Sequence, residues 1–474
     1  MDFYKHKTSQ IREKRLGTIS AYYGNAETIL NEINSGNINQ RIRTFSQDIF
    51  SDIQYAVQLL STIRDIAIVV HGPAGCSLAR FNFDLSYDDS VKVAVTNLNE
   101  RDSIMGSEVK LKDAIKQVYS NYSPKLIFIV TTPVVAINND DVDSVADEFK
   151  ADNNINVIPL YTDGFRSKTG ISGYDAALHA IIKNLLPKKL NSTITKGNFI
   201  NLLSISENIN DIKELIRLLN SIGLPVNILP RFSSIENFTK SPDALVSVTI
   251  NPDESNYLGG AISEKYGIPL LQPPLPLGIK KTSEWINQIA KVFNLEEAAG
   301  KVIIEEVSLL EKFLENHKYT GKKIFINLPP AYAFEIIEFL EDLGFETVAV
   351  KVPYLDKTHI HYLEKFASEK SELPILVGEG QSFEDVNAIL KTKPDLYICL
   401  SADSDNAIKE GVPVIDIGSI PVLGYKGVYN LIENIERKLT NLSFVSYLSD
   451  SKSNVYADSW LQKKPNWYIK QEVK

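Results

Sequence analysis

Cysteine is scarce in this sequence: a chain of 474 residues has only two, Cys76 and Cys399. Two thiols are too few for a four-cysteine metal site, so any cluster that needs four thiolates has to be shared with another chain. A structural disulfide is not expected either, because thiols in a reducing compartment stay reduced. Each cysteine therefore needs its own explanation.

The sequence also lacks long apolar runs and an excess of basic residues. No stretch reaches the roughly 18 apolar residues that a membrane-spanning helix needs, and the charged start MDFYKHKTSQIREKRLG has no apolar core of the kind found in signal peptides. The formal net charge is -9, which argues against non-specific nucleic-acid binding because that depends on Lys and Arg neutralising phosphates. We expect a cytoplasmic protein that binds neither nucleic acid nor membrane.

Short β-branched runs alternate with longer amphipathic segments along the chain, a pattern typical of βαβ units and parallel sheets. It predicts an α/β fold of three tandem Rossmann-like domains, with mostly parallel four- to five-stranded sheets flanked by helices. The predicted divisions are an N-terminal arm over residues 1–40, domain I over 41–192, domain II over 193–320, domain III over 321–440 and a C-terminal arm over 441–474.

Residues 65–76, DIAIVVHGPAGC, have the pattern of a strand that ends in a glycine-rich turn with one cysteine. Open parallel sheets bind ligands at the carboxyl ends of their strands. Glycines such as Gly75 let the backbone approach a bulky group closely, and Cys76 just past the turn could offer a thiolate. Taken alone, the motif fits a buried turn cysteine better than a ligand.

Several motifs together resemble the nitrogenase component 1 type oxidoreductase family. That family has a strand ending in His-Gly-x-x-Gly-Cys, as at 71–76, and later Thr-Thr-Cys with an Ile-Gly-Asp-Asp-like turn, where this chain reads Thr131-Thr132-Pro133 and then INND at 137–140. The resemblance extends over about residues 40 to 435. It includes the segments 100–111, Gly164-Phe165, 251–286, 394–418 and GYKG at 424–427.

The resemblance implies a bridging iron-sulfur cluster with one ligand from this chain. Of the family's three bridging-cluster cysteine positions, the middle one is Cys76, while Ser51 and Pro133 stand at the other two. This is similar to the N-type chain of the cofactor-assembly scaffold, or to a K-type beta chain that has kept one cysteine. It implies a [4Fe-4S]-like cluster shared with a partner chain, with Ser51, Gly75 and Thr132 beside Cys76 as cofactor-binding residues.

The family's substrate-reducing site is not complete in this chain. The alpha-type catalytic chain holds its cofactor by a cysteine in domain II and a histidine in domain III, but residues 244–250 contain no cysteine and Leu423 stands near the histidine position. The resemblance thus implies a beta-like subunit without a catalytic site of its own. A homologous, cysteine-richer alpha-like subunit would complete an α2β2 heterotetramer. An ATP-dependent Fe protein would pass electrons through the cluster to the partner, for reductive catalysis or cofactor assembly.

Two other functions stay open at this point: a cluster-free structural or scaffold subunit, and a small-molecule-binding protein with tandem Rossmann-like domains. Further residues have their own hypotheses. Cys399, inside an apolar strand, is expected to be buried packing. His359 and His361 would share one face of an extended segment and could bind a metal, or lie in a solvated loop. Arg80 could tune the cluster or form a surface ion pair, and the loop GEGQS at 378–382 could bind an anion.

Overall fold

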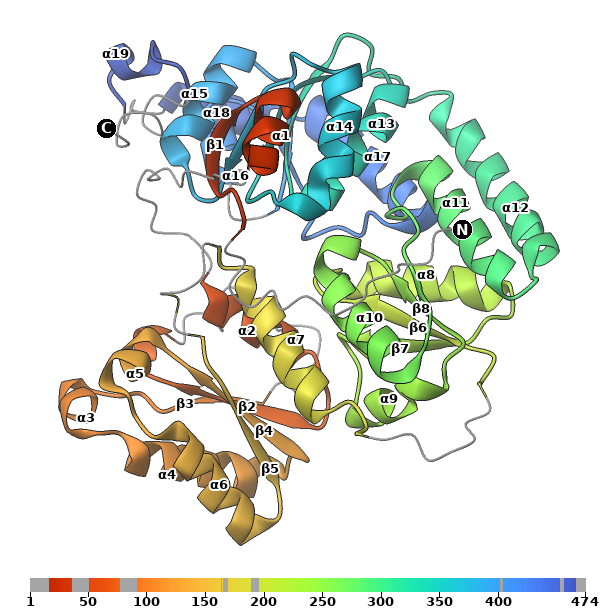
Figure 1. The fold of residues 1–474 in the computed structure, drawn as a ribbon. Coiled ribbons are helices and arrows are strands. Elements are labelled where there is room, and N and C mark those ends of the chain that lie inside the picture. The colour runs from red at the N-terminus through yellow and green to blue at the C-terminus, as the bar shows by residue number, and fades with distance from the viewer. Residues whose placement is uncertain are drawn as a thin grey trace. The chain divides into compact units, whose positions relative to one another are not determined.

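The computed structural model describes residues 17–35, 51–76, 92–162, 164, 169–188, 196–400, 404–451 and 456–465. They form three mostly parallel sheets flanked by helices (Figure 1), which confirms the predicted α/β class. The chain separates into two compact units. The first holds described residues within 50–206 and 224–272, and the second those within 17–49, 207–223 and 273–474.

The first sheet of the first unit carries the cysteine motif. Its strand order is β3 (Val93–Val95), β2 (Ile66–His71), β4 (Leu126–Thr131) and β5 (Asn156–Leu160), all parallel. Every residue of β2 and β4 is buried, as expected for parallel strands that are covered on both faces and therefore apolar throughout.

Helices cover both faces of this sheet. Helices α4 (Glu108–Tyr122) and α6 (Val142–Asn153) form a core with β2 and β4 on one face, while α2 (Asp52–Ser61) and α7 (Ser172–Asn184) pack against each other and against the sheet. Two short helices follow the strand ends: α3 (Glu100–Met105) after β3, and α5 (Pro133–Asn138) after β4.

The second sheet of the first unit has the order β7 (Val226–Pro230), β6 (Ile200–Ser204), β8 (Val246–Thr249) and β9 (Leu270–Leu271), again all parallel. Helix α9 (Ile235–Lys240) follows β7, and α10 (Pro252–Tyr266) packs on β6, β8 and β9. Among the described residues, no helix is both long enough and apolar enough to cross a membrane.

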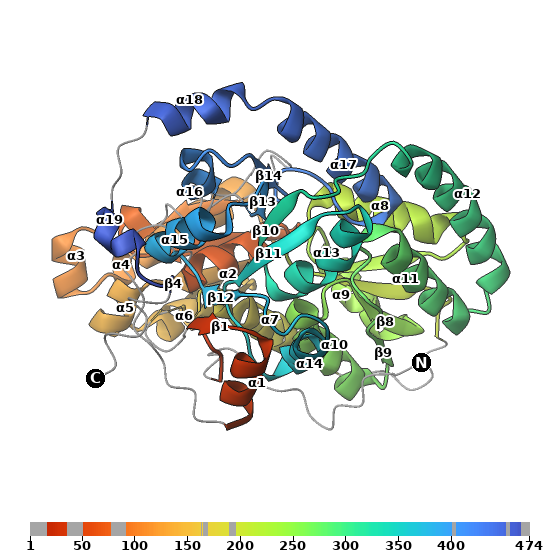
Figure 2. The same cartoon turned by 90° about the horizontal axis from the view of Figure 1, so that it is seen from above.

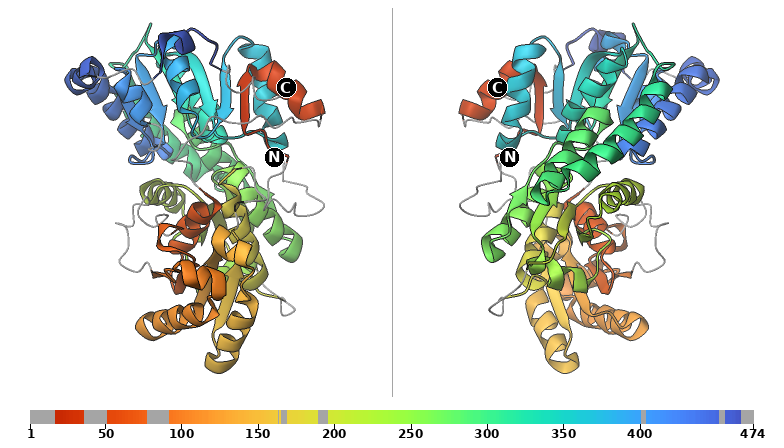
Figure 3. Two further views of the ribbon diagram at one scale, coloured as in Figure 1. Left: turned by 90° about the vertical axis from the view of Figure 1, so that its left-hand side faces the viewer. Right: turned by 90° about the vertical axis from the view of Figure 1, so that its right-hand side faces the viewer.

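The sheet of the second unit has six strands, one more than the predicted maximum. Five parallel strands, β12 (Ile375–Gly378), β11 (Glu346–Val352), β10 (Lys323–Asn327), β13 (Leu396–Cys399) and β14 (Val414–Asp416), are extended by β1 (Ala21–Gly24), which pairs antiparallel with β12 at the edge (Figure 2). Residues 17–35, predicted to belong to an arm, are thus part of this unit, because β1 joins the sheet and α1 (Ala26–Ser35) packs on α14 (Ile360–Glu369) (Figure 3).

The second unit contains further helices. They are α8 (Ile209–Ser221), α11 (Gly278–Val292), α12 (Glu296–Leu314), α13 (Pro330–Asp342), α15 (Ser382–Thr392), α16 (Ser404–Lys409), α17 (Gly424–Thr440), α18 (Ser443–Ser451) and α19 (Asp458–Leu461). Among them, α8 and α12 both pack on α17.

The close packing of α2 on α7 can be tested at Gly173. A Cβ atom at this position would overlap the backbone carbonyl of Asp52, so we expect Gly173→Ala to push the helices apart and destabilise the protein by about 1–3 kcal/mol. Gly260 in α10 is the matched control, because it is also buried but a Cβ there meets no atom within 4 Å. Gly260→Ala should be neutral or stabilise by up to about 1 kcal/mol. Urea denaturation of both variants decides; equal effects would contradict the packing argument.

Candidate functional site

The site is built on the register between β2 and β4. His71 at the end of β2 lies opposite Thr131 at the end of β4, so the turns that follow the two strands leave the sheet side by side. Gly72 and Thr132 are in close contact there, because a Cβ atom on Gly72 would overlap the Thr132 side chain. A larger residue than glycine at position 72 would force the two turns apart.

Cys76 and Thr132 meet at this edge. Cys76 is a free, half-buried thiol whose backbone N–H donates to the Pro73 carbonyl at 3.1 Å. Burial raises the pKa of the thiol, and the Thr132 hydroxyl lowers that pKa in part. The Thr132 side chain is fully buried, and its Oγ1 has no hydrogen-bond partner of normal geometry among the described residues. A buried hydroxyl with spare bonding capacity thus lies beside the thiol.

The other two predicted ligand positions begin helices. Ser51 is the N-cap of α2 and donates its backbone N–H to Gln54 Oε1 at 2.6 Å. Thr132 is the N-cap of α5 and Pro133 its first residue, where the missing N–H of proline costs nothing because that group would have no helical partner. Both positions therefore have a local structural role that requires no metal.

These helix starts converge through Gly164. The Gly164 N–H donates to Asp52 Oδ2 at 2.9 Å, and a Cβ on Gly164 would lie 3.7 Å from Asp52 Oδ1 and 3.9 Å from Pro133 Cγ. The start of α2, the start of α5 and the β2 turn thus reach one edge of the sheet. Gly75 in that turn is exposed, and a Cβ on it would meet no described atom within 4 Å.

The chemistry of this donor set fits one corner of a shared cluster. It offers one thiol, a buried Thr132 hydroxyl beside that thiol and a glycine turn that leaves room among the described atoms, but Pro133 has no ligand atom. Four thiolates hold a [4Fe-4S] cluster, so three would have to come from elsewhere.

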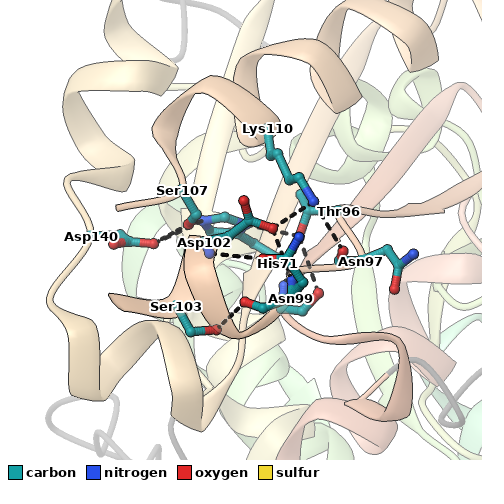
Figure 4. Close-up of polar contacts among 10 residues, drawn as sticks. His71, Thr96, Asn97, Asn99, Asp102, Ser103, Ser107, Lys110 and Asp140 are labelled. Carbon is teal, nitrogen blue, oxygen red and sulfur yellow. Dashed lines mark hydrogen bonds and ion pairs between the residues drawn. The ribbon is translucent and has the colours of Figure 1, made fainter. Parts of the chain in front are cut away.

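A buried hydrogen-bonded chain next to this edge was not recognised as a site from the sequence (Figure 4). His71 Nδ1 lies 3.1 Å from Thr96 Oγ1, and Nε2 lies 3.1 Å from Ser107 Oγ. The Ser107 hydroxyl in turn donates to Asp140, whose Oδ2 is 3.5 Å from His71 Nε2. Thr96 Oγ1 accepts from the Gly72 N–H at 2.9 Å and donates to the Gly72 carbonyl at 3.2 Å. The chain therefore ties the turn before Cys76 to the start of α4 and to the loop before α6.

The His71 ring is fully buried, and this decides its charge. Burial lowers the pKa of His71 to about 4, although Asp140 and Glu108 oppose this shift. The imidazole is therefore neutral at neutral pH.

Four large apolar side chains are exposed at the same end of this sheet. Ile104 and Met105 at the end of α3 are 81% and 76% exposed, Val109 in the first turn of α4 is 73% exposed, and Ile137 on α5 is 71% exposed. Helices α3 and α5 contact each other. These four residues form what we call the α3–α5 patch.

The remaining predicted candidates have different surroundings. Arg80 and Phe165 lie outside the described residues. Cys399 is fully buried inside β13, as the packing hypothesis predicted. The extended geometry that would have put both histidines on one face is wrong, because His359 ends a 3-10 turn and His361 lies in the first turn of α14.

Two further predicted positions, the loop at 378–382 and Leu423, lie in the second unit. The loop at 378–382 leads into α15, whose first turn carries the buried acids Glu384 and Asp385. The Asp385 carboxylate accepts from the buried Lys351 ammonium at 2.7 Å. The N–H groups of Val422 and Leu423, at the start of α17, both donate to Asp211 Oδ1 at 2.7 Å.

Comparison with known proteins gives a consistent result. The family model described as nitrogenase component 1 type oxidoreductase matches residues 54–440. The chain is 26% identical over 392 residues to the nitrogenase iron-molybdenum cofactor biosynthesis protein NifE of Clostridium pasteurianum, covering 80% of this chain and 84% of that protein. It is 29% identical over 301 residues to the nitrogenase molybdenum-iron protein alpha chain of Methanosarcina barkeri, covering 60% of this chain and 56% of that one.

A solved structure shares the fold. Nitrogenase Cp1 at pH 6.5 superposes with a TM-score of 0.72 at 19% sequence identity, covering 88% of this chain and 93% of that one.

The buried His71 predicts a pH-dependent stability. The ordinary pKa of histidine is 6.5, while that of folded His71 is about 4, so below pH 6.5 the unfolded chain binds more protons and the folded state loses stability as the pH falls. From pH 7 to pH 5 this costs roughly 2 kcal/mol. We expect His71→Gln to lose that much less stability over this range in urea denaturation. Ser107→Ala keeps the imidazole and should keep the loss. A His71→Gln profile identical to wild type would refute the assignment.

Proposed function

This chain belongs to the nitrogenase component 1 type oxidoreductase family, and we propose that it is a beta-like subunit of a nitrogenase-like complex that gives one thiolate to a shared cluster. The observation that carries the proposal is the half-buried Cys76 beside the buried hydroxyl of Thr132, at the edge where β2 and β4 end. The cluster would be [4Fe-4S]-like and would be completed by a homologous, cysteine-richer alpha-like subunit.

The residues of this chain have separable roles in that proposal. The cluster would supply one-electron storage and transfer. Cys76 would bind iron as a thiolate. Because burial raises the pKa of the thiol, the free thiol is protonated, and the metal would have to displace that proton on binding. Thr132 would direct its hydroxyl at the sulfur and moderate its charge. Gly75 would leave room for the cluster, and Ser51 would line it from the start of α2.

The α3–α5 patch would be the docking surface for an ATP-dependent Fe protein. Large apolar side chains that are exposed together often mark an interaction site. Met105 is two residues before Ser107, which bonds to the His71 ring at the end of β2. The patch therefore flanks the same strand ends as Cys76, and a donor docked there would be near the shared cluster.

The site on which the electrons act would be on the partner, in an α2β2 heterotetramer. Residues 244–250 contain no cysteine. Leu423, which occupies the N-cap position of α17, is fully buried and has no side-chain atom that could bind a metal. Sequence similarity does not separate reductive catalysis from cofactor assembly, since the relatives include a biosynthesis protein and a catalytic alpha chain. The identity of the partner chain decides between the two roles.

One observation favours a second candidate, a cluster-free structural subunit. Ser51 and Pro133 both fit their helix starts without a metal, so the edge can fold without iron. The two candidates differ in the iron content of the complex.

Replacing each cysteine in turn tests the proposal. In the anaerobically purified complex with its co-expressed partner, we expect Cys76→Ala to lose most of the bridging-cluster iron and its EPR signal, because water or a hydroxyl replaces a thiolate poorly. Cys399→Ala is the control: it trims a fully buried thiol in β13, costs on the order of 1 kcal/mol and should keep the iron. Unchanged iron in Cys76→Ala would favour the cluster-free subunit.

A charge placed in the α3–α5 patch tests docking. Met105→Glu should slow electron transfer from the Fe protein about tenfold or more, since burying an unpaired carboxylate at an interface exceeds the 1.4 kcal/mol that a factor of ten requires, while cluster iron stays unchanged. Ile304→Glu is the matched control, because Ile304 on α12 is 72% exposed against 76% for Met105. Stopped-flow oxidation of the Fe protein measures both. Equal rates in the two variants would exclude this patch.

A further inference from the structure

The hydrogen bonds around His71 define which protons its ring can carry. Thr96 Oγ1 has one proton and donates it to the Gly72 carbonyl, while it accepts from the Gly72 N–H. The Ser107 hydroxyl likewise donates its single proton to Asp140. Both oxygens can then only accept from the ring nitrogens that face them.

Every one of these contacts is satisfied at once only if both ring nitrogens carry a proton. Nδ1–H then donates to Thr96 Oγ1 at 3.1 Å and Nε2–H donates to Ser107 Oγ at 3.1 Å. Neutral His71 has one proton fewer, so one of the two hydroxyls has to turn toward the ring and give up its other acceptor, either the Gly72 carbonyl or Asp140. The geometry thus suits an imidazolium.

Two opposing effects act on that charge. The ring is 0% exposed and burial penalises the cation, while the carboxylates that face it, Asp140 from the loop before α6 and Glu108 from the first turn of α4, favour it. On the strand side the ring faces the uncharged Thr96 of the β3 turn. Figure 4 also shows Asp102 and Lys110, which form an ion pair with each other at 2.5 Å. One additional negative charge nearby would shift this balance toward the protonated ring.

We propose that His71 is the proton acceptor that accompanies reduction of the shared cluster beside Cys76. This inference rests on the proposed function, because it needs a cluster at Cys76. One electron comes from an external one-electron donor, such as an iron-sulfur reductase protein or dithionite, and enters the shared cluster.

One proton from solvent balances that electron. The solvent proton first binds the Asp140 carboxylate. Ser107 then passes its hydroxyl proton to His71 Nε2 and takes the proton of Asp140 in its place, which restores the Asp140 carboxylate. No bond between heavier atoms forms or breaks. His71 acts through charge and hydrogen bonding and is a positioning residue for this step, since Thr96 and Gly72 connect it to the turn that carries Cys76.

The test is an EPR-monitored redox titration of the intact complex at several pH values between 6 and 8. In wild type the midpoint potential should fall as the pH rises, approaching one proton per electron. His71→Gln should remove this dependence. Asp140→Asn keeps the imidazole but removes its counter-charge, so it should weaken the pH dependence of the midpoint potential. This variant serves as the test if His71→Gln does not assemble. His317→Gln, in the second unit, is the control and should behave as wild type.

The outcomes separate this inference from the function on which it rests. A wild-type potential that does not change with pH, or a dependence that persists in both His71→Gln and Asp140→Asn, would overturn the proton acceptor and leave the cluster assignment intact. A wild-type complex without cluster iron would overturn both.

Discussion

The parallel, in-register pairing of β2 with β4 is the constraint on which the candidate site depends. It places His71 opposite Thr131, and the contact between Gly72 and Thr132 then holds the two following turns together. A shift of the register by one residue would turn the alternating side chains to the other face of the sheet and would separate Cys76 from Thr132. Both strands are apolar and buried on both faces, so a slipped strand would press each side chain against the helices of the opposite face and disturb their close packing.

At the same edge, two of the positions that the sequence predicts as former ligand positions have local structural roles. The first N–H groups of a helix have no partner within the helix and need one from elsewhere. The residue that precedes a helix at a strand end can supply it. Ser51 is a preferred N-cap type and Pro133 suits the first helical position. These residues stabilise the helix starts by local interactions that involve no metal. Cys76 is the last described residue of the turn after β2, and its half-buried thiol lies beside the Thr132 hydroxyl.

The parts of this structure that the sequence predicted are those determined by local pattern. The buried strands β2 and β4 follow from apolar runs, and the Cys76 turn follows from its glycines. Strand β1 was missed because its four residues pair with β12, more than 350 residues later, and only the folded sheet creates that edge. The His71 chain was missed as a site because Thr96, Ser107 and Asp140 come from three separate segments and are ordinary residues in each. Polar networks of this kind depend on tertiary distances, which periodicity does not contain.

Charge at this edge limits what can assemble there. Asp52, Glu108 and Asp140 lie around the strand ends, and the His71 ring is neutral at neutral pH because burial holds its pKa at about 4. A bound thiolate and an electron-rich cluster would add negative charge to surroundings that already contain carboxyl groups, in a chain with a net charge of -9. Electrostatic repulsion in a partly buried site is weakly screened by salt, so this charge has to be offset by the partner's hydrogen-bond donors or cations, or by a proton taken up within the edge. Of the side chains in the buried chain of Figure 4, His71 is the one that can become a cation by taking up a proton.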